Sequence, residues 1–176
     1  MKKSKILSSV WIGIIVLIAT FLQACGYHIR GFSSSDRERS IAVLPFRNET
    51  TEPNVEILIT DALRKLFIKR GRFKLTSPSD ADLIFRGRVL KIYTSDVAHL
   101  DVEKTTETRV YVVLDVRCEN PKTGKVVWQD NQFRFYEEYK QGTYAFETFG
   151  ARQAALEYLA EQVAERIYDR FTIHVF

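Results

Sequence analysis

The sequence predicts an α+β domain in which two amphipathic helices pack on one face of a mainly antiparallel, mixed sheet of four to five strands. Two stretches of the chain, 55–67 and 151–171, repeat apolar residues at helical spacing. Before and between them lie short apolar stretches, one of which alternates apolar and polar residues without a break. The resulting order, strand, helix, strands, helix, is typical of α+β domains, because each helix buries its apolar side on a sheet.

The first 24 residues have the pattern of a signal peptide and are not expected to belong to the domain. Three lysines near the start precede an apolar run from residue 10 to residue 22, and Ala24 is the small residue expected before a cleavage site. An uncleaved transmembrane anchor is the alternative, but such an anchor needs roughly 20 strongly apolar residues. Polar residues limit the run at both ends, namely Ser8, Ser9, Thr20 and Gln23.

Cys25 follows this small residue directly, and the segment Leu22-Gln23-Ala24-Cys25 resembles a bacterial lipobox. Cleavage there would make Cys25 the N-terminus, where the amine can carry an N-acyl chain such as palmitate and the thiol an S-diacylglycerol. Several such chains together anchor a protein stably to a membrane. A plain cleavage site with an incidental cysteine is the alternative.

The lipoprotein interpretation divides the chain into three parts. These are a signal peptide at 1–24, a lipidated N-terminus and polar linker at 25–39, and a single domain at 40–176. The precursor has 26 basic and 22 acidic residues, and loss of the three leader lysines leaves 23 basic residues. A nearly neutral mature chain does not favour binding to nucleic acid. With Cys25 acylated, Cys118 has no intrachain disulfide partner and is expected to be a small buried apolar residue.

The first strand and the first helix of the domain have clear signals. Residues 40–46 form a short apolar run that predicts a buried strand, and a cluster of turn-forming residues follows at 48–53. Pro53 suits the first turn of the next helix, and Gly71 suits its C-terminal end. The helix buries one stripe of residues, Val55, Leu58, Ile59, Ala62, Leu63, Leu66 and Phe67.

Four further strands are predicted at 73–76, 83–93, 109–119 and 126–138. The strict alternation in 109–119 predicts a strand with one buried and one solvated face. Gly87 and the change of parity toward Leu90 indicate a β-bulge in the strand before it. A turn at 120–124 has the length of a hairpin connection, so the last two strands are expected to pair antiparallel.

The second helix is predicted from about Glu147 to Phe171. Its solvent side carries Glu157, Glu161 and Glu165. Its apolar stripe comprises Ala151, Ala154, Ala155, Tyr158, Leu159, Val163, Ile167 and Phe171.

No group of residues has the pattern of a catalytic or metal site. The three histidines, His28, His99 and His174, are far apart and lack the acidic or i, i+4 neighbours of a zinc site. We therefore expect no enzymatic activity and no cofactor beyond the acyl groups. Two connecting segments, 94–108 and 136–149, are rich in polar or aromatic residues and are candidates for binding. Ordinary connections between elements are the alternative for both.

The segment that begins at the lipobox cysteine, Cys25-Gly26-Tyr27-His28-Ile29-Arg30-Gly31, resembles the start of mature lipopolysaccharide-assembly lipoproteins of the LptE family. These typically begin Cys-Gly-(Trp/Tyr)-His-Leu-Arg, so Ile29 in place of leucine and Gly31 after the arginine are mild departures. The resemblance implies a lipoprotein of the outer membrane that faces the periplasm. It also implies a plug in the lumen of a large β-barrel partner of the LptD type, and binding of lipopolysaccharide. Gly26, in place of the aspartate that signals retention in the inner membrane, agrees with this location.

Cations on protruding segments could bind the phosphates of lipid A by charge-assisted hydrogen bonds. By position, the candidate ligands are Lys104, Arg109 and Lys140, with Arg86 and Arg88 in reserve. A competing resemblance comes from residues 41–50, IAVLPFRNET, which are similar to the opening of envelope lipoproteins related to curli secretion and to activators of cell-wall synthases. That alternative would make the protein an assembly or regulatory factor with other partners.

Overall fold

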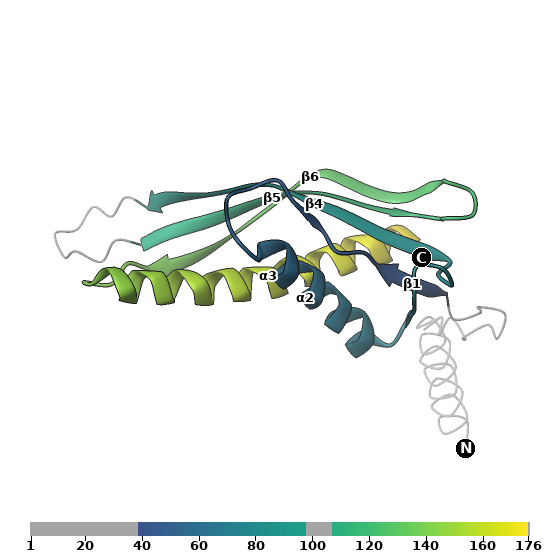
Figure 1. Cartoon of the computed structure of the whole chain (residues 1–176), viewed down its shortest axis with the longest axis horizontal. Helices are drawn as coiled ribbons and strands as arrows, with labels where there is room; N and C mark the ends of the chain where they lie inside the picture. The colour runs from purple at the N-terminus through teal and green to yellow at the C-terminus, as the bar shows by residue number, and fades with distance from the viewer. Residues whose placement is uncertain (1–38, 98–106, 176) are drawn as a thin grey trace, which may run out of the picture. The chain divides into compact units, whose positions relative to one another are not determined.

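The structure, a computed structural model, describes residues 39–97 and 107–175. These residues form one layer of strands and one layer of two helices (Figure 1). The elements, in chain order, are β1 (Ser40–Val43), β2 (Arg47–Asn48), α2 (Val55–Arg70), β3 (Lys74–Leu75), β4 (Leu83–Val97), β5 (Glu107–Glu119), β6 (Val126–Lys140) and α3 (Ala145–Val175).

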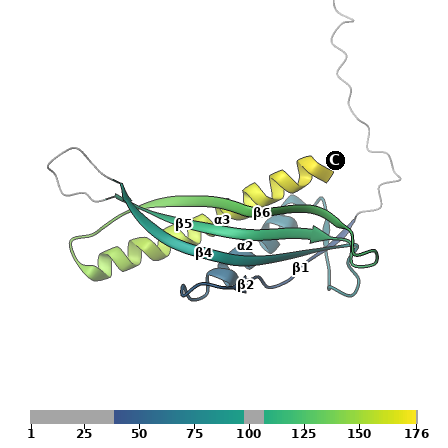
Figure 2. The ribbon, with the colours of Figure 1, turned by 90° about the horizontal axis from the view of Figure 1, so that it is seen from above.

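The sheet is mixed, as predicted, and runs in the order β3-β1-β4-β5-β6, with β2 also beside β4. The three long strands β4, β5 and β6 pair antiparallel, whereas β1, β2 and β3 pair parallel with their neighbours. Both helices cover the same face of the sheet, so the predicted α+β fold class is confirmed (Figures 1 and 2). The strand count is higher than predicted, because residues 47–48 pair with β4 where the sequence indicated a turn.

Helix α2 has the predicted apolar stripe and the predicted C-terminal end. Gly71 adopts the left-handed conformation (φ 62°) and its N–H donates to the carbonyl of Phe67. The prediction for Pro53 was wrong: the helix begins at Val55, after Asn54, so the proline precedes the first turn. Asn48 holds this approach in place, because its side-chain amide donates to the carbonyl of Glu52 at 2.7 Å.

Aromatic rings join the two layers in the centre of the core. Phe171 of α3 lies 4.9 Å from Phe85 of β4 and 6.3 Å from Trp128 of β6, measured between ring centroids. Phe67 of α2 contacts Phe85 and Phe171 at 5.5 and 6.4 Å. Both helices and two of the long strands therefore depend on one cluster of rings.

The long strands and the second helix extend beyond their predicted ends. Strand β4 continues to Val97 because Thr94, Ser95 and Asp96 pair with β5, although these residues carry no apolar pattern. Strand β6 reaches Lys140. Helix α3 begins at Ala145, where the Glu147 carboxylate accepts a hydrogen bond from the backbone N–H of Tyr144 at 3.1 Å.

These longer elements correct the two candidate loops. Of the segment 136–149, only residues 141–144 connect β6 to α3, because strand and helix take up the rest. Of the segment 94–108, residues 98–106 lie outside the described part of the chain. The predicted bulge is confirmed: the register of β4 against β5 shifts between Val89 and Lys91.

Cys118 of β5 is fully buried within the core, as predicted. Burial raises the pKa of its thiol to about 12, with a smaller contribution from the negative charge of Glu119. The thiol is therefore protonated at neutral pH and behaves as an apolar group.

Candidate functional site

One face of the three long strands is left uncovered by the helices, and we call it the open face. Side chains alternate between the two faces of a strand. Every second residue of β5 is buried against the helices, so the residues between them point away from the helices. Figure 2 looks onto this side of the sheet, with α3 behind it. The open-face residues of β5 are Arg109, Tyr111, Val113, Asp115 and Arg117. Polar residues thus dominate this face, as expected for the solvated side of a mainly antiparallel sheet.

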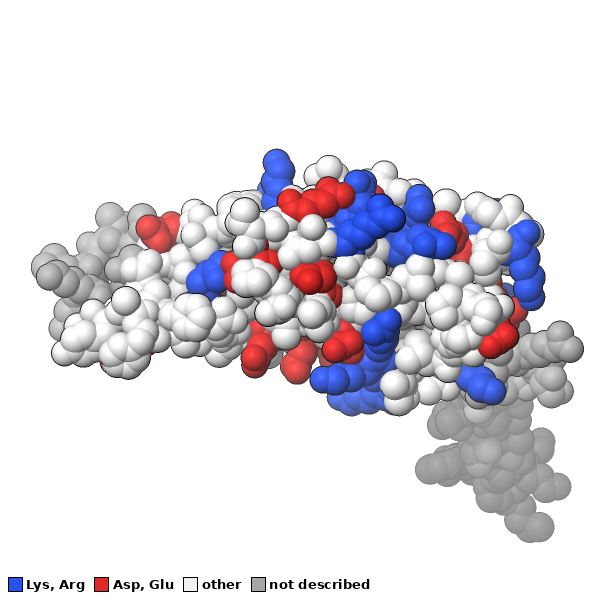
Figure 3. Space-filling view, viewed as in Figure 1, with Lys and Arg blue, Asp and Glu red and all other residues white. Residues whose placement is uncertain are grey.

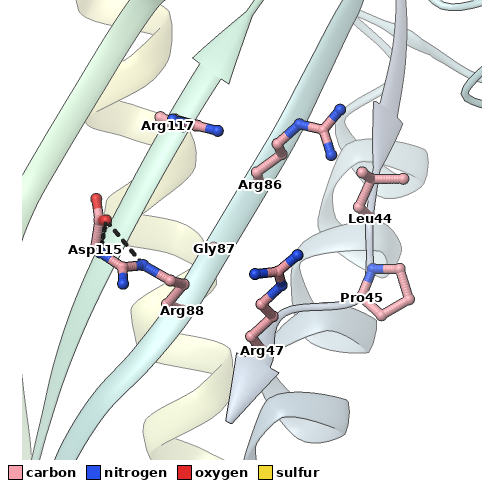
Figure 4. A pocket seen from close by; sticks show the side chains of 8 residues that line it. All are labelled: Leu44, Pro45, Arg47, Arg86, Gly87, Arg88, Asp115 and Arg117. Carbon is pink, nitrogen blue, oxygen red and sulfur yellow. Dashed lines mark hydrogen bonds and ion pairs between the residues drawn. The ribbon is translucent and has the colours of Figure 1, made fainter. Parts of the chain in front are cut away.

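Four arginines converge on one depression of this face, which has a volume of about 610 Å³. We call it the arginine depression. Its residues come from separate parts of the chain and surround Gly87 (Figure 4). The arginines are Arg47 of β2, Arg86 and Arg88 of β4, and Arg117 of β5, and the other lining residues are Leu44, Pro45, Gly87 and Asp115.

Strand register explains why these arginines meet. Arg86 lies directly opposite Arg117 in the β4–β5 pair, and Arg88 lies beside Arg47 in the β2–β4 pair. Like charges that face each other across a pair of strands destabilise it. A sheet selected for stability alone would avoid this arrangement, so the cluster suggests a binding role.

Carboxylates neutralise part of this charge. Arg88 donates to Asp115 at 2.7 Å and to Glu49 at 3.1 Å, and these hydrogen bonds raise the pKa of the Arg88 guanidinium, Asp115 first. Arg86 lies 2.5 Å from Glu119 and Arg117 lies 3.4 Å from the same carboxylate. With four arginines and three carboxylates, the site keeps one net positive charge.

Two groups in the arginine depression keep unused hydrogen-bonding capacity. Among the residues that the structure describes, the exposed Arg47 side chain has no ion pair or hydrogen bond. The Oδ1 atom of Asp115 is buried and likewise has no hydrogen-bond partner in the described part of the chain. A ligand with acceptor groups could bind Arg47 without breaking an existing contact.

The predicted ligands Arg109 and Lys140 lie elsewhere on the open face. Arg109 donates to Glu138 at 2.7 Å, which raises the pKa of the guanidinium, and it lies 4.9 Å from the centre of the Tyr136 ring. It stands six residues from Asp115 along β5, about 20 Å at the usual rise of a strand. Lys140 is the exposed last residue of β6. Lys104 lies outside the described residues.

A row of tyrosines separates Arg109 from the arginine depression. Tyr93, Tyr111 and Tyr136 are neighbours across β4, β5 and β6. The first two rings are stacked, with centroids 4.9 Å apart and planes 6° apart, and the next pair lies 5.3 Å apart. On the open face, the tyrosines therefore have Arg109 and Lys140 on one side and the arginine depression on the other.

Sequence reasoning identified part of the arginine depression. It named Arg86 and Arg88 as reserve ligands but missed Arg47 and Arg117. The alternation of β5 already placed Arg117 on the solvated face, which was an available signal. Arg47 gave none, because its position depends on two residues that pair with β4 outside any apolar pattern.

Within residues 39–97 and 107–175, no cluster of three or more His, Cys, Asp or Glu side chains could hold a metal ion. In the same residues, no helix combines the length and the apolar character needed to cross a membrane.

The fold is a two-layer α+β domain, and several solved bacterial proteins share it. Protein CT253 from Chlamydia trachomatis is similar with a TM-score of 0.55 at 11% identity, over 79% of this chain and 98% of that one. Protein XCC0632 from Xanthomonas campestris has a TM-score of 0.53 at 12% identity, over 77% and 85%. A candidate lipoprotein from Caulobacter crescentus CB15 has a TM-score of 0.50 at 15% identity, over 74% and 90%. At such identities these likenesses show the fold alone.

The sequence itself identifies the family. The family model LptE, described as lipopolysaccharide-assembly, matches residues 38–171, and the chain belongs to this family. The match confirms the resemblance drawn from residues 25–30, which lie outside the matched range. No curated protein matches the sequence.

Proposed function

We propose that this protein is a non-enzymatic lipoprotein that helps to assemble lipopolysaccharide at the outer membrane. The match to the lipopolysaccharide-assembly family over residues 38–171 is the observation that carries the proposal. The lipobox supports an N-terminus acylated on Cys25 after removal of a signal peptide, with the domain on the periplasmic side. The acyl chains then tether a folded domain to the membrane.

The domain is proposed to fill the lumen of a large outer-membrane β-barrel of the LptD type. The interior of such a barrel is polar. The solvated open face, with its ion pairs and tyrosines, suits contact with a polar wall better than contact with lipid acyl chains. The rigid aromatic core beneath it would hold this surface in a fixed shape.

Lipopolysaccharide is proposed to bind the open face through the phosphates of lipid A. The planar guanidinium group donates two parallel hydrogen bonds to a phosphate, a geometry that lysine cannot match. The arginine depression offers four such groups, among them Arg47, which has no partner in the described residues. Arg109 and Lys140 remain candidate ligands farther along the same strands. Lys104, which lies outside the described residues, remains a candidate from the sequence alone.

Purification from native membranes tests both the proposed β-barrel partner and the proposed lipid anchor on Cys25. We expect a large outer-membrane β-barrel to co-purify, and mass spectrometry to find a mature chain that starts at acylated Cys25. Co-purification of a peptidoglycan synthase or a secretion pore instead would favour the competing envelope-lipoprotein function. An intact leader, or an unmodified thiol at the N-terminus, would contradict the anchor.

Binding of labelled lipopolysaccharide tests the arginine depression. The double variant Arg47→Gln/Arg117→Gln is expected to bind at least about 10-fold to 100-fold more weakly, because the loss of a single charged hydrogen bond is already worth roughly 1.5–3 kcal/mol. The fold should tolerate both changes, since Glu119 keeps its contact with Arg86 at 2.5 Å. Thermal unfolding should therefore differ little from that of the unmodified protein.

Two further variants complete this experiment. Lys74→Gln/Lys125→Gln removes two exposed cations outside the arginine depression and should bind normally. Arg109→Gln/Lys140→Gln measures the contribution of the cations that the sequence singled out. If the Arg47→Gln/Arg117→Gln protein is folded and binds lipopolysaccharide as the unmodified protein does, the arginine depression is not the ligand site.

A further inference from the structure

The two helices enclose a groove between them on the side away from the sheet. We call it the helix groove, and its volume is about 480 Å³. Small alanines form much of its floor, which leaves room for the side chains of another molecule. The floor residues are Leu58, Ala62, Leu66, Ala160 and Ala164. The helix groove is separate from the open face, because the sheet lies between them (Figure 1).

The two walls of the helix groove carry opposite charges. Lys65 and Lys69 line the α2 wall, and Glu157, Glu161 and Glu165 line the α3 wall. Acidic and basic side chains lie next to one another along the helical side of the molecule in Figure 3.

None of these five side chains has an ion pair within the described part of the chain. The contrast with the open face is clear, because Arg86, Arg88 and Arg109 all contact carboxylates there. Asp61 also lines the α2 wall, but Arg64 pairs with it at 3.5 Å. The α2 wall is therefore a basic surface and the α3 wall an acidic one, and each lacks a partner.

We propose that the helix groove is a self-association surface through which two copies of this chain, while outside a barrel, form a symmetric dimer. A two-fold axis along the groove turns the second copy over, so that its α2 lies across from the first copy's α3. Lys65 and Lys69 of each copy then face the acidic α3 wall of the other, because both walls line the same groove. The same contact is made twice, as in any isologous interface.

Charge complementarity favours a second copy over other occupants. A basic or an acidic partner would be attracted by one wall and repelled by the other, whereas a rotated copy satisfies both walls. Ile57 of the groove and Tyr158, the neighbour of Glu157, are about half exposed and would lose water on association. Burial of such large apolar side chains contributes to the free energy of association, whereas exposed charge pairs alone contribute little.

The size of the helix pair sets the expected strength. A 16-residue helix such as α2 is about 24 Å long. Two helices side by side span about 20 Å, so each copy can bury roughly 500 Å². The total, about 1,000 Å², is at the low end for specific interfaces and indicates a weak, reversible dimer that high salt would dissociate.

Charge reversal on one wall at a time tests this proposal. Lys65→Glu/Lys69→Glu makes both walls acidic, and Glu161→Lys/Glu165→Lys makes both walls basic. Sedimentation equilibrium of the mature lipoprotein, in detergent matched to the density of the solvent, is expected to show a dimer for the unmodified chain. Each variant alone should associate at least about 10-fold more weakly, because both contacts become repulsive. An equimolar mixture of the two should restore the dimer, since every contact is attractive again.

Controls exclude unfolding and unspecific charge effects. These side chains are exposed or, for Glu165, partly exposed, and they are unpaired within the described residues, so circular dichroism should show unchanged folding. Lys74→Glu/Lys125→Glu reverses two charges outside the helix groove and should leave the dimer intact. The proposal is overturned if the unmodified chain stays monomeric up to about 100 µM. It is equally overturned if either folded variant dimerises normally, or if the mixture of folded variants stays monomeric.

Discussion

Replacing Phe171 by alanine is expected to lower the free energy of unfolding by about 3–5 kcal/mol. The ring is fully buried and lies at the centre of the aromatic cluster that joins both layers. Its centroid is 4.9 Å from that of Phe85 and 6.4 Å from that of Phe67. Removal of the ring would leave a cavity bordered by both helices and the sheet. Rearrangement of the neighbouring side chains would not be enough to fill it.

Urea unfolding followed by circular dichroism measures this change. Phe146→Ala in the same helix is the matched control, because that ring is 73% exposed and its removal should change stability by less than about 0.5 kcal/mol. If Phe171→Ala costs no more than Phe146→Ala, the aromatic cluster does not hold the two layers together.

Adding one methyl group at Gly87 is expected to destabilise the protein by about 1–3 kcal/mol. A Cβ atom at this position would lie 2.2 Å from Cε2 of Phe46, far inside van der Waals contact. The Phe46 ring cannot move freely, because it is only 3% exposed and its backbone N–H donates to the Thr60 hydroxyl at 3.0 Å. Gly87→Val should cost more than Gly87→Ala for the same reason.

A double-mutant cycle checks the cause of this effect. Phe46→Leu removes part of the ring that the new methyl group would strike, so the double variant Phe46→Leu/Gly87→Ala should be more stable than the sum of the single losses predicts. Urea unfolding of the four proteins gives the coupling energy. Additive losses would mean that Gly87 is required for a reason other than contact with Phe46.

The sequence predicted the parts of the fold that depend on burial. Helix α2 was identified from its apolar stripe and from Gly71, and β5 from strict alternation, because both patterns follow directly from contact with one core. Strand β2 and the outer ends of β4 and β6 were missed. Backbone pairing extends the sheet along these residues, and too few of them pack against the core to give a repeated apolar pattern.

The candidate site was harder to predict because it depends on register. Arg86 meets Arg117, and Arg88 meets Arg47, only in the observed pairing of strands. A shift of one residue would turn alternate side chains to the other face. No local pattern near Arg47 indicated that it would lie beside β4. Individual cations could thus be named from the sequence, but their convergence required the structure.

Cys118 provides a built-in chemical probe of the sheet. With Cys25 blocked by acyl chains, it would be the one thiol left in the mature chain. An alkylating reagent can reach this fully buried sulfur only when β5 separates from its neighbours or the domain opens as a whole. The rate of alkylation therefore reports how often the sheet opens in native conditions. A barrel or lipid whose binding keeps the sheet from opening should slow the alkylation of Cys118, even when the melting temperature of the protein hardly changes.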